Sequence, residues 1–219
     1  MKLLVHRPCS WGLMRPEACT WVSSIRPTMF DAFFADTEIA HFNTNSGCTA
    51  IARNNAAKEA IDGGFDLLLM IDPDMQPDIY ADEPFAKTFI ESSLELLREH
   101  PISIVGAPYM LPNAESAVRL FGDSGIDNPH NDTIASRVRE PFHEHVPRMG
   151  TGLMLINVDV FRRVPEPWFK YVIDDRWQVL NLTEDFYFCS NAAKHGIKTY
   201  CNWYAFAGHW HAQCLKAPI

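Results

Sequence analysis

The chain has 219 residues, which is enough for one sizeable α/β domain and too few for two domains of ordinary size. Hydrophobic residues make up 47% of the chain and charged residues 21%, a balance that is typical of folded globular proteins and excludes intrinsic disorder. The formal net charge of −8 argues against non-specific binding to nucleic acid, because such binding needs clustered Lys and Arg side chains.

The first half of the chain predicts an alternation of strands and helices. Short apolar runs bounded by turn residues predict buried strands, and apolar or alanine-rich spacing of three to four residues predicts helices. The predicted strands are 3–6, 38–42, 67–71 and 102–107; the predicted helices are 29–35, 49–60 and a helix that Pro84 opens, with Ala86, Ile90, Leu94 and Leu97 on one face. This βαβαβ order favours a mostly parallel sheet that is covered by helices.

The second half is less regular. Residues 113–146 mix turn formers and charges with little periodicity, which predicts a loop-rich excursion with short strands. Further elements are predicted as a strand at 151–158, a helix at 183–195 that Gly196 closes, and a strand at 198–201. Since no internal repeat or linker interrupts the pattern, we expect a single domain over 1–219.

Cysteine usage and hydropathy bear on the compartment. The six cysteines form no CxxC pair and no framework spacing, which favours free thiols in a reducing compartment. No stretch approaches the roughly 18 apolar residues that span a bilayer, and the apolar start at 3–5 is too short for a secretory segment. We therefore expect a cytoplasmic protein that makes no use of a membrane.

Two carboxylates follow directly on the predicted strand at 67–71. Asp72 and Asp74 are two residues apart, so in an extended chain their side chains point the same way. Ligands of open parallel sheets bind beyond the carboxyl ends of the strands, and paired carboxylates suit Mg²⁺ or Mn²⁺ shared with phosphate oxygens. Taken alone, Asp-Pro-Asp is more typical of a simple turn than of a metal site.

Five segments in order make the chain similar to a known family. They are ARNNAAKEAIDGGFDLLLMIDPDMQPD, MGTGLMLINVDVFRRV, PWF, TEDFYFC and AGHWH. Together they resemble the GT-A glycosyltransferases, most of all the small, inverting, DxD-containing family 2-type members, over about residues 52–211. The resemblance implies a Rossmann-like three-layer α/β/α sandwich, with a nucleotide-sugar-binding half at about 1–112 and an acceptor-binding half at about 113–219.

The resemblance also implies metal and catalytic residues. Asp74 would be a direct ligand of the divalent metal and Asp72 a ligand or a partner of the ribose, with a late histidine, His209 or His211, completing the metal shell. Asp185 would be the general base and Glu184 would orient the acceptor. The competing interpretation of the last pair is structural, since acidic residues in a first helical turn stabilise a helix without any catalytic role.

The remaining expected contacts are with the nucleotide-sugar. Arg53 would face the nucleotide, where its guanidinium fork matches phosphate oxygens, and glycines allow close approach of the backbone to donor or acceptor. The full set of residues that we expect near the donor is Pro8, Cys9, Ser10, Arg53, Asn54, Asp72, Gly150 and Gly152.

The function that follows from the resemblance is a glycosyltransferase that uses Mn²⁺ or Mg²⁺ and a nucleoside-diphosphate sugar, with a UDP-sugar expected first. Long C-terminal helices of processive synthases are absent from this sequence, so we expect non-processive transfer. The acceptor is a hydroxyl compound, either a saccharide or a polymer such as a hydroxylated base in DNA. Two alternatives remain, a nucleotidyltransferase acting on sugar phosphates and a non-catalytic carbohydrate-binding relic; HRPCSWGLMRP lacks the Gly-rich loop that the first would carry.

Overall fold

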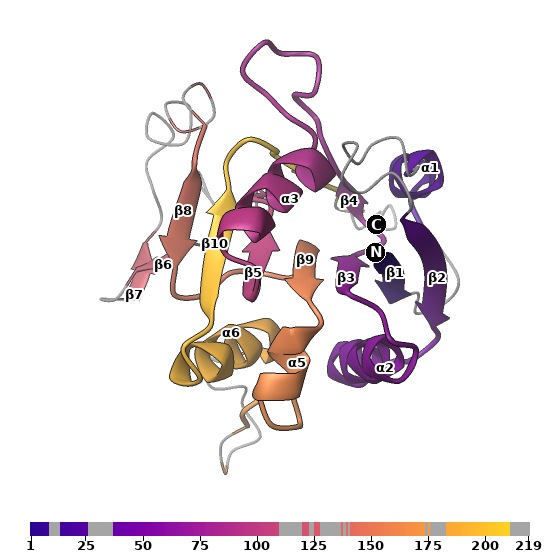
Figure 1. The fold of residues 1–219 in the computed structure, drawn as a ribbon, viewed down its shortest axis with the longest axis vertical. Helices are drawn as coiled ribbons and strands as arrows, with labels where there is room; N and C mark the ends of the chain where they lie inside the picture. Colours follow the sequence, from indigo (N-terminus) through magenta and orange to yellow (C-terminus); the bar gives the residue numbers. More distant parts are fainter. Residues whose placement is uncertain are drawn as a thin grey trace, which may run out of the picture.

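A seven-stranded sheet forms the centre of the computed structural model, which describes residues 1–8, 14–25, 37–109, 120–122, 125–127, 137, 139, 141–173, 175 and 183–210. The strand order is β2-β1-β3-β9-β5-β10-β8 (Figure 1). The bounds are β1 Lys2–Pro8, β2 Glu38–Thr44, β3 Leu67–Ile71, β5 Ser103–Gly106, β8 His143–Val146, β9 Leu153–Asn157 and β10 Lys198–Asn202.

The sheet is mixed in direction. Strands β2, β1, β3, β5 and β10 run one way, because β1 pairs in parallel with β2 and β3, and β10 pairs in parallel with β5. Strand β9 lies between β3 and β5 and is antiparallel to both, and β8 is antiparallel to β10 at the edge. The prediction of a mostly parallel sheet therefore holds for the majority of strands, while the reversed central strand β9 was not predicted.

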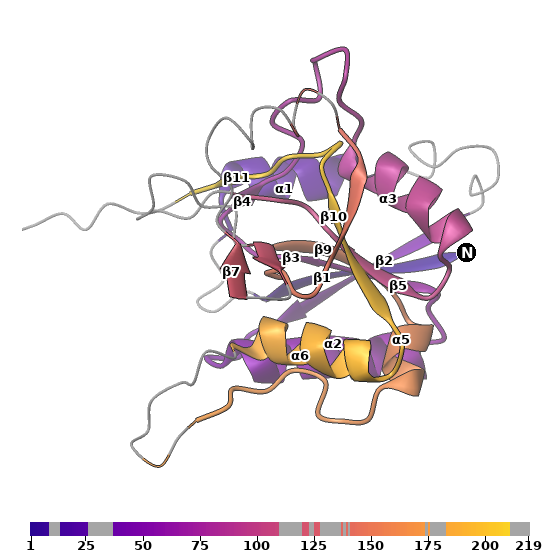
Figure 2. The same cartoon turned by 90° about the vertical axis from the view of Figure 1, so that its left-hand side faces the viewer.

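Alternate side chains of the buried strand β3 enter two separate hydrophobic clusters. Leu68 and Met70 pack in one cluster with helices α2, α5 and α6, whereas Leu67, Leu69 and Ile71 pack in the other with α1 and α3. Figure 2 shows these two groups of helices on opposite faces of the sheet. The helices are α1 Pro16–Ser24, α2 Thr49–Asp62, α3 Phe89–Glu99, α5 Asp159–Arg163 and α6 Glu184–Lys194.

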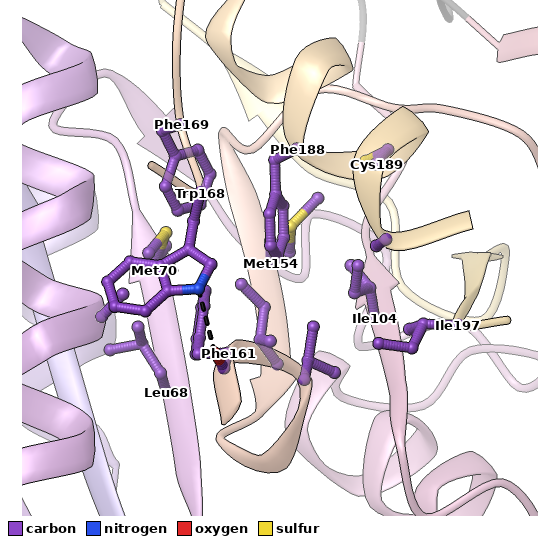
Figure 3. Packing of buried hydrophobic residues seen from close by; sticks show 14 of the residues in the cluster. Leu68, Met70, Ile104, Met154, Phe161, Trp168, Phe169, Phe188, Cys189 and Ile197 are labelled. Atoms are coloured by element: carbon purple, nitrogen blue, oxygen red, sulfur yellow. Dashed lines mark hydrogen bonds between the residues drawn. The ribbon is translucent and has the colours of Figure 1, made fainter. Parts of the chain in front are cut away.

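Aromatic residues dominate the first of these clusters (Figure 3). The ring of Phe188 in α6 lies 5.4 Å from that of Phe161 in α5 and 4.5 Å from that of Phe169. The Trp168 indole donates hydrogen bonds to the carbonyls of Phe161 and Val164, so its polar group is satisfied inside the core. This packing fixes α6, whose first turn carries the predicted catalytic acids.

Most predicted elements are confirmed, with differences at α1, α3 and α5. Helix α3 begins at Phe89 rather than at Pro84, because the Thr88 side chain caps it by accepting a hydrogen bond from the Glu91 backbone, and the preceding residues form turns. Helix α1 and the short α5 were not predicted. The predicted helix at 29–35 lies outside the described residues, as does most of the excursion at 113–146.

Two short strand pairs complete the described strands. Strand β4 (Met75–Gln76) pairs with β11 (Gly208–His209), and β6 (Leu120–Gly122) pairs with β7 (Gly125–Asp127).

The helices in the described part of the chain are all too short or too polar to cross a membrane.

Candidate active site at the carboxyl edge of the sheet

The turn after β3 is held from two sides by the backbone. The Asp72 N–H donates to the Gly152 carbonyl at 2.8 Å, which ties the turn to the start of β9. The Pro73 carbonyl accepts from the Arg15 N–H at 2.9 Å, and the Asp74 carbonyl accepts from the Trp210 N–H at 2.8 Å. Both predicted carboxylates therefore leave the same edge of the sheet from a fixed backbone.

His209 is brought to this turn by pairing of β4 with β11. In that pairing Met75 lies opposite His209, and the imidazole Nε2 comes within 3.2 Å of Asp74 Oδ2. The Asp74 side chain keeps 44% of its exposure and that of His209 keeps 13%. Two predicted metal ligands, 135 residues apart in sequence, thus form a pair that solvent reaches.

The guanidinium of Arg53 is bonded to carboxylates. Its Nη2 donates to both carboxylate oxygens of Asp72 at 3.0 Å, and Nη1 donates to Glu184 Oε1 at 2.5 Å. Arg53 is only 3% exposed. The structure therefore directs this guanidinium to two acidic residues, one after β3 and one at the start of α6, where the sequence predicted phosphate oxygens.

Burial and charge shift the pKa values of the two residues that form the core of this arrangement. Burial, together with the neighbouring charge of Asp74, raises the pKa of Asp72 to about 6, against the opposing effect of Arg53. Burial alone would lower the pKa of Arg53, but Asp72, Glu184 and Asp185 outweigh it and raise that pKa. The guanidinium therefore stays charged and holds Asp72 in place.

Glu184 is buried with its charge already engaged. Besides the ion pair with Arg53, it shares a hydrogen bond with the Tyr171 hydroxyl, whose pKa is raised to about 12 by burial and by the Glu184 charge. Only 6% of Glu184 is exposed. The expected role of Glu184 in orienting an acceptor does not fit this geometry, since both Arg53 and Tyr171 already bind its carboxylate.

Asp185, the neighbouring acid, has its two oxygens in different surroundings. Oδ1 accepts hydrogen bonds from the Thr183 hydroxyl and, at 2.8 Å, from the Phe186 N–H. Oδ2 points toward Gly150, 3.6 Å from where a Cβ would stand on that residue. The first oxygen thus fixes the carboxylate at the start of α6, and the second faces the glycine loop before β9.

The two predicted glycines are covered by a tyrosine. A Cβ on Gly150 would stand 2.0 Å from the Tyr109 hydroxyl oxygen, and one on Gly152 would stand 3.0 Å from Tyr109 Cε1 and from the Met75 sulfur. A side chain at Gly150 would therefore collide with the Tyr109 hydroxyl, and one at Gly152 would be tightly packed against the Tyr109 ring and Met75.

Asn54 is used within the fold. Its carbonyl oxygen accepts from the Trp168 and Phe169 N–H groups, and its amide nitrogen donates to the Ala50 and Phe169 carbonyls at 2.7 Å. The amide has no bonding capacity left for a nucleotide, so the expectation of a donor contact for Asn54 does not fit the structure. Pro8 ends β1 at the same edge of the sheet, while Cys9, Ser10 and His211 lie outside the described residues.

His6 is a buried polar residue near this site that the sequence did not single out. It is fully buried in β1, and its Nε2 lies 2.9 Å from the Thr44 hydroxyl. Burial, reinforced by the charge of Arg53, lowers the pKa of His6 to about 3. The imidazole is therefore neutral at physiological pH and adds no charge beside Arg53.

The donor atoms fit a divalent cation that a substrate also coordinates. In the described ranges there is no cluster of three or more His, Cys, Asp or Glu residues around one point. Asp74 and His209 supply one carboxylate and one imidazole, a combination that suits Mn²⁺, and phosphate oxygens could supply the remaining ligands. Asp72 stands beside this pair with both oxygens already accepting from Arg53.

Tyr109 and Tyr171 were missed because neither belongs to a motif. The one signal that could have found Tyr109 is the spacing of Gly150 and Gly152, which indicates that something approaches the backbone closely. From sequence alone, that approach is indistinguishable from the approach of a substrate.

Comparison with known proteins gives the fold. Neither the family models nor the curated proteins contain a match to this sequence. Among solved structures, A197 from STIV is 18% identical with a TM-score of 0.62, over 97% of this chain and 87% of that one. GalNAc-T7, solved with UDP, GalNAc and Mn²⁺, is 11% identical with a TM-score of 0.51, and the match covers 95% of this chain but only 43% of that one. The chain therefore has the GT-A type of fold that these two structures share with it.

Proposed function

We propose that the chain is a metal-dependent glycosyltransferase that moves a sugar from a nucleoside-diphosphate sugar to a hydroxyl acceptor, with inversion and without processivity. The observation that carries this proposal is the convergence of acidic residues at one edge of the sheet. Asp72 and Asp74 follow β3, His209 lies in β11, and Asp185 begins α6. A three-layer GT-A domain with a donor-binding half at about 1–112 and an acceptor-binding half at about 113–219 accommodates this arrangement.

We assign the cation to Asp74 and His209. Asp74, which is 44% exposed, and the less exposed His209 can bind Mn²⁺ or Mg²⁺ while leaving coordination positions for the diphosphate of the donor. The cation would supply neutralisation of the charge that develops on the leaving diphosphate. UDP-sugars are the first donors to test, because GalNAc-T7 binds UDP together with Mn²⁺ on the same fold.

Asp185 is the proposed general base. Its Oδ1 is fixed by Thr183 and the Phe186 backbone, so Oδ2 is the oxygen that can take the proton of an acceptor hydroxyl. The acceptor oxygen then bonds to the anomeric carbon as the bond from that carbon to the diphosphate breaks. Such attack from the side opposite to the leaving group inverts the configuration of the sugar.

Arg53 and Glu184 have positioning roles in this proposal. The buried Arg53 joins Asp72, on the donor side, to Glu184, which precedes the proposed base. Because the two carboxylates are held by one rigid, planar group, the donor side and the base side keep a constant separation. Neither residue needs to touch a substrate for this role.

A saccharide is favoured over DNA as the acceptor. Arg137 donates to Glu144 at 2.9 Å and stacks over Trp203, and Arg162 pairs with Asp159 at 2.5 Å. These two cations are therefore neutralised within the fold. Retention on a DNA column at low salt that is lost in Arg137→Ala would contradict this preference.

The test is product analysis with a panel of UDP-, GDP-, CDP- and dTDP-sugars, with Mn²⁺ and with EDTA. We expect Mn²⁺-dependent release of a nucleoside diphosphate and a rise in melting temperature with the matching donor. Release of pyrophosphate would indicate a nucleotidyltransferase, and binding of sugars without release of any nucleotide would indicate a non-catalytic relic.

The variant Asp185→Asn tests the proposed base within the same assay. We expect it to bind donor with unchanged affinity and to lose roughly 10²- to 10⁴-fold in turnover, which is what a general base contributes. The exposed Glu59→Gln on α2 is a matched carboxylate-to-amide control and should keep full turnover. Full turnover by Asp185→Asn would show that another group removes the proton.

A further inference from the structure

Tyr109 lies between the two functional parts of the site. It lies shortly after the end of β5. Its side chain is partly buried against the cluster that contains Met75, Leu153 and Ala207. On one side its ring meets His209, and on the other its hydroxyl approaches Gly150 and Asp185.

The ring end of Tyr109 contacts His209 edge-on. The ring centroids are 5.2 Å apart with an angle of 77° between the ring planes. The backbones are joined as well, since Tyr109 forms a parallel bridge with Ala207 and the Ala207 N–H donates to the Pro108 carbonyl at 3.0 Å. The strand that carries His209 is therefore fixed to Tyr109 two residues before the imidazole.

The hydroxyl end of Tyr109 faces Gly150, the glycine that Asp185 Oδ2 also faces. The point where a Gly150 Cβ would stand is 2.0 Å from the Tyr109 oxygen and 3.6 Å from Asp185 Oδ2, so both atoms border the same small space. The backbone of Gly152 makes a hydrogen bond with the phenol. Burial, together with the charge of Asp185, raises the pKa of the phenol. A phenol that is held in this way limits where Oδ2 can stand.

We propose that Tyr109 is a positioning residue, whose ring orients His209 and whose hydroxyl orients Asp185. The inference rests on the proposed function and extends it, because it gives Gly150 and Gly152 a different purpose: they make room for Tyr109. One rigid side chain would then set the distance between the bound cation and the base. The effects of its two ends are separable by substitution.

The main experiment compares Tyr109→Phe with Tyr109→Leu, using Mn²⁺ and UDP as calorimetric ligands and the matching UDP-sugar for kinetics. Tyr109→Phe keeps the ring, so we expect Mn²⁺–UDP affinity within about twofold of wild type, an unchanged donor KM and a kcat lower by about 10- to 100-fold. Tyr109→Leu removes the ring too, so it should also lose about tenfold in Mn²⁺–UDP affinity. The matched control is Tyr200→Phe in β10, which removes the hydroxyl of a tyrosine that stacks on His100. This variant should match wild type in both measurements.

Some results would overturn the inference while leaving the proposed function intact. A wild-type kcat in Tyr109→Phe would show that the hydroxyl does not position the base. Equal losses of Mn²⁺–UDP affinity in the Phe and Leu variants would show that the ring does not position His209. If the wild-type protein neither binds Mn²⁺–UDP nor releases a nucleotide from any donor, it is the proposed function that fails.

A stability measurement tests the seating of Tyr109 without any substrate. Gly150→Ala should lower the melting temperature of the wild-type protein by about 5 °C or more, because the new methyl meets the phenol oxygen. In the Tyr109→Phe background the same change should lower the melting temperature by less than about half as much. The atom nearest to the new methyl is then the ring carbon Cζ, at 3.0 Å. Equal costs in the two backgrounds would show that Tyr109 does not occupy this space, and the inference would be wrong whatever the activity.

Discussion

The two acidic parts of the site differ in their access to solvent. Asp72 and Glu184 are bonded to the buried guanidinium of Arg53, whereas Asp74 lies 3.2 Å from the imidazole of His209 and is 44% exposed. Buried charges are costly unless they are paired, so the first group serves structure and fixes geometry. The second group can exchange its partner for a ligand. We call Arg53, Asp72 and Glu184 the frame, and Asp74 with His209 the proposed binding site. Similar residue types thus have different roles according to their burial.

The largest expected effect comes from breaking the frame. Arg53→Met leaves the buried Glu184 and the partly buried Asp72 without a cation, and removing one partner of a buried pair costs about 3–5 kcal/mol in the free energy of unfolding. Urea unfolding followed by circular dichroism measures this cost. The exposed Lys58→Met on the same helix is the control and should change stability by no more than about 0.5 kcal/mol. A loss of that small size in Arg53→Met would contradict the frame.

Removing the proposed metal ligand Asp74 should affect binding strongly and stability little. A direct ligand contributes no less than the surrounding groups that orient it, so Asp74→Ala should weaken Mn²⁺-dependent UDP binding by about 100-fold or more. Its free energy of unfolding should change little, because the side chain is half exposed. Calorimetry with and without Mn²⁺ measures the first effect. The control is the exposed Asp82→Ala in the loop after β4, which should bind like wild type; equal weakening in both variants would exclude Asp74 as a ligand.

The last expected effect is a change in how stability depends on pH, and it tests the consequence of burying His6. Its pKa is about 3 in the folded chain and 6.5 when unperturbed, so between these values the unfolded state binds more protons. Stability therefore falls as pH is lowered from about 6.5 toward 3, with a contribution from His6 of up to about 1.4 kcal/mol per pH unit.

The variant His6→Gln measures this contribution. Glutamine can still bond to Thr44 but cannot take up a proton, so the dependence of unfolding free energy on pH should be shallower than in wild type between pH 6 and 4. Replacement of the exposed His195 by Gln controls for the loss of an imidazole as such. Identical slopes in wild type and His6→Gln would show that His6 is protonated in the folded protein.

The sequence predicted local structure well and pairing direction less well. The sequence predicted the strand Leu67–Ile71 and the alanine-rich helix after Cys48 at nearly their observed bounds. Both depend on the local pattern of apolar residues, which can be seen directly in the sequence. Strand β9 has the same apolar composition whichever way it runs, and its direction depends on the long excursion that precedes it. Hence the reversed strand at the centre of the sheet could not be predicted from composition.

The same distinction holds for the site. The motif order predicted that Asp74 would be joined by either His209 or His211, and in the structure His209 lies within 3.2 Å of Asp74. It could not show that Arg53 turns toward Asp72 and Glu184, because an arginine fork fits carboxylates and phosphates equally well. Tyr109 could not be identified at all, since its position depends on the close approach of three separate chain segments.

The pairing of β4 with β11 has a consequence for biosynthesis. Every strand of the main sheet has been synthesised by Asn202, whereas the proposed cation pair needs His209, which must reach back to Asp74. The strands of the main sheet therefore need no residue beyond Asn202, whereas the proposed cation pair forms only once β11 has folded back onto β4. Loading with metal would then report that the final turn of the described chain has reached its place.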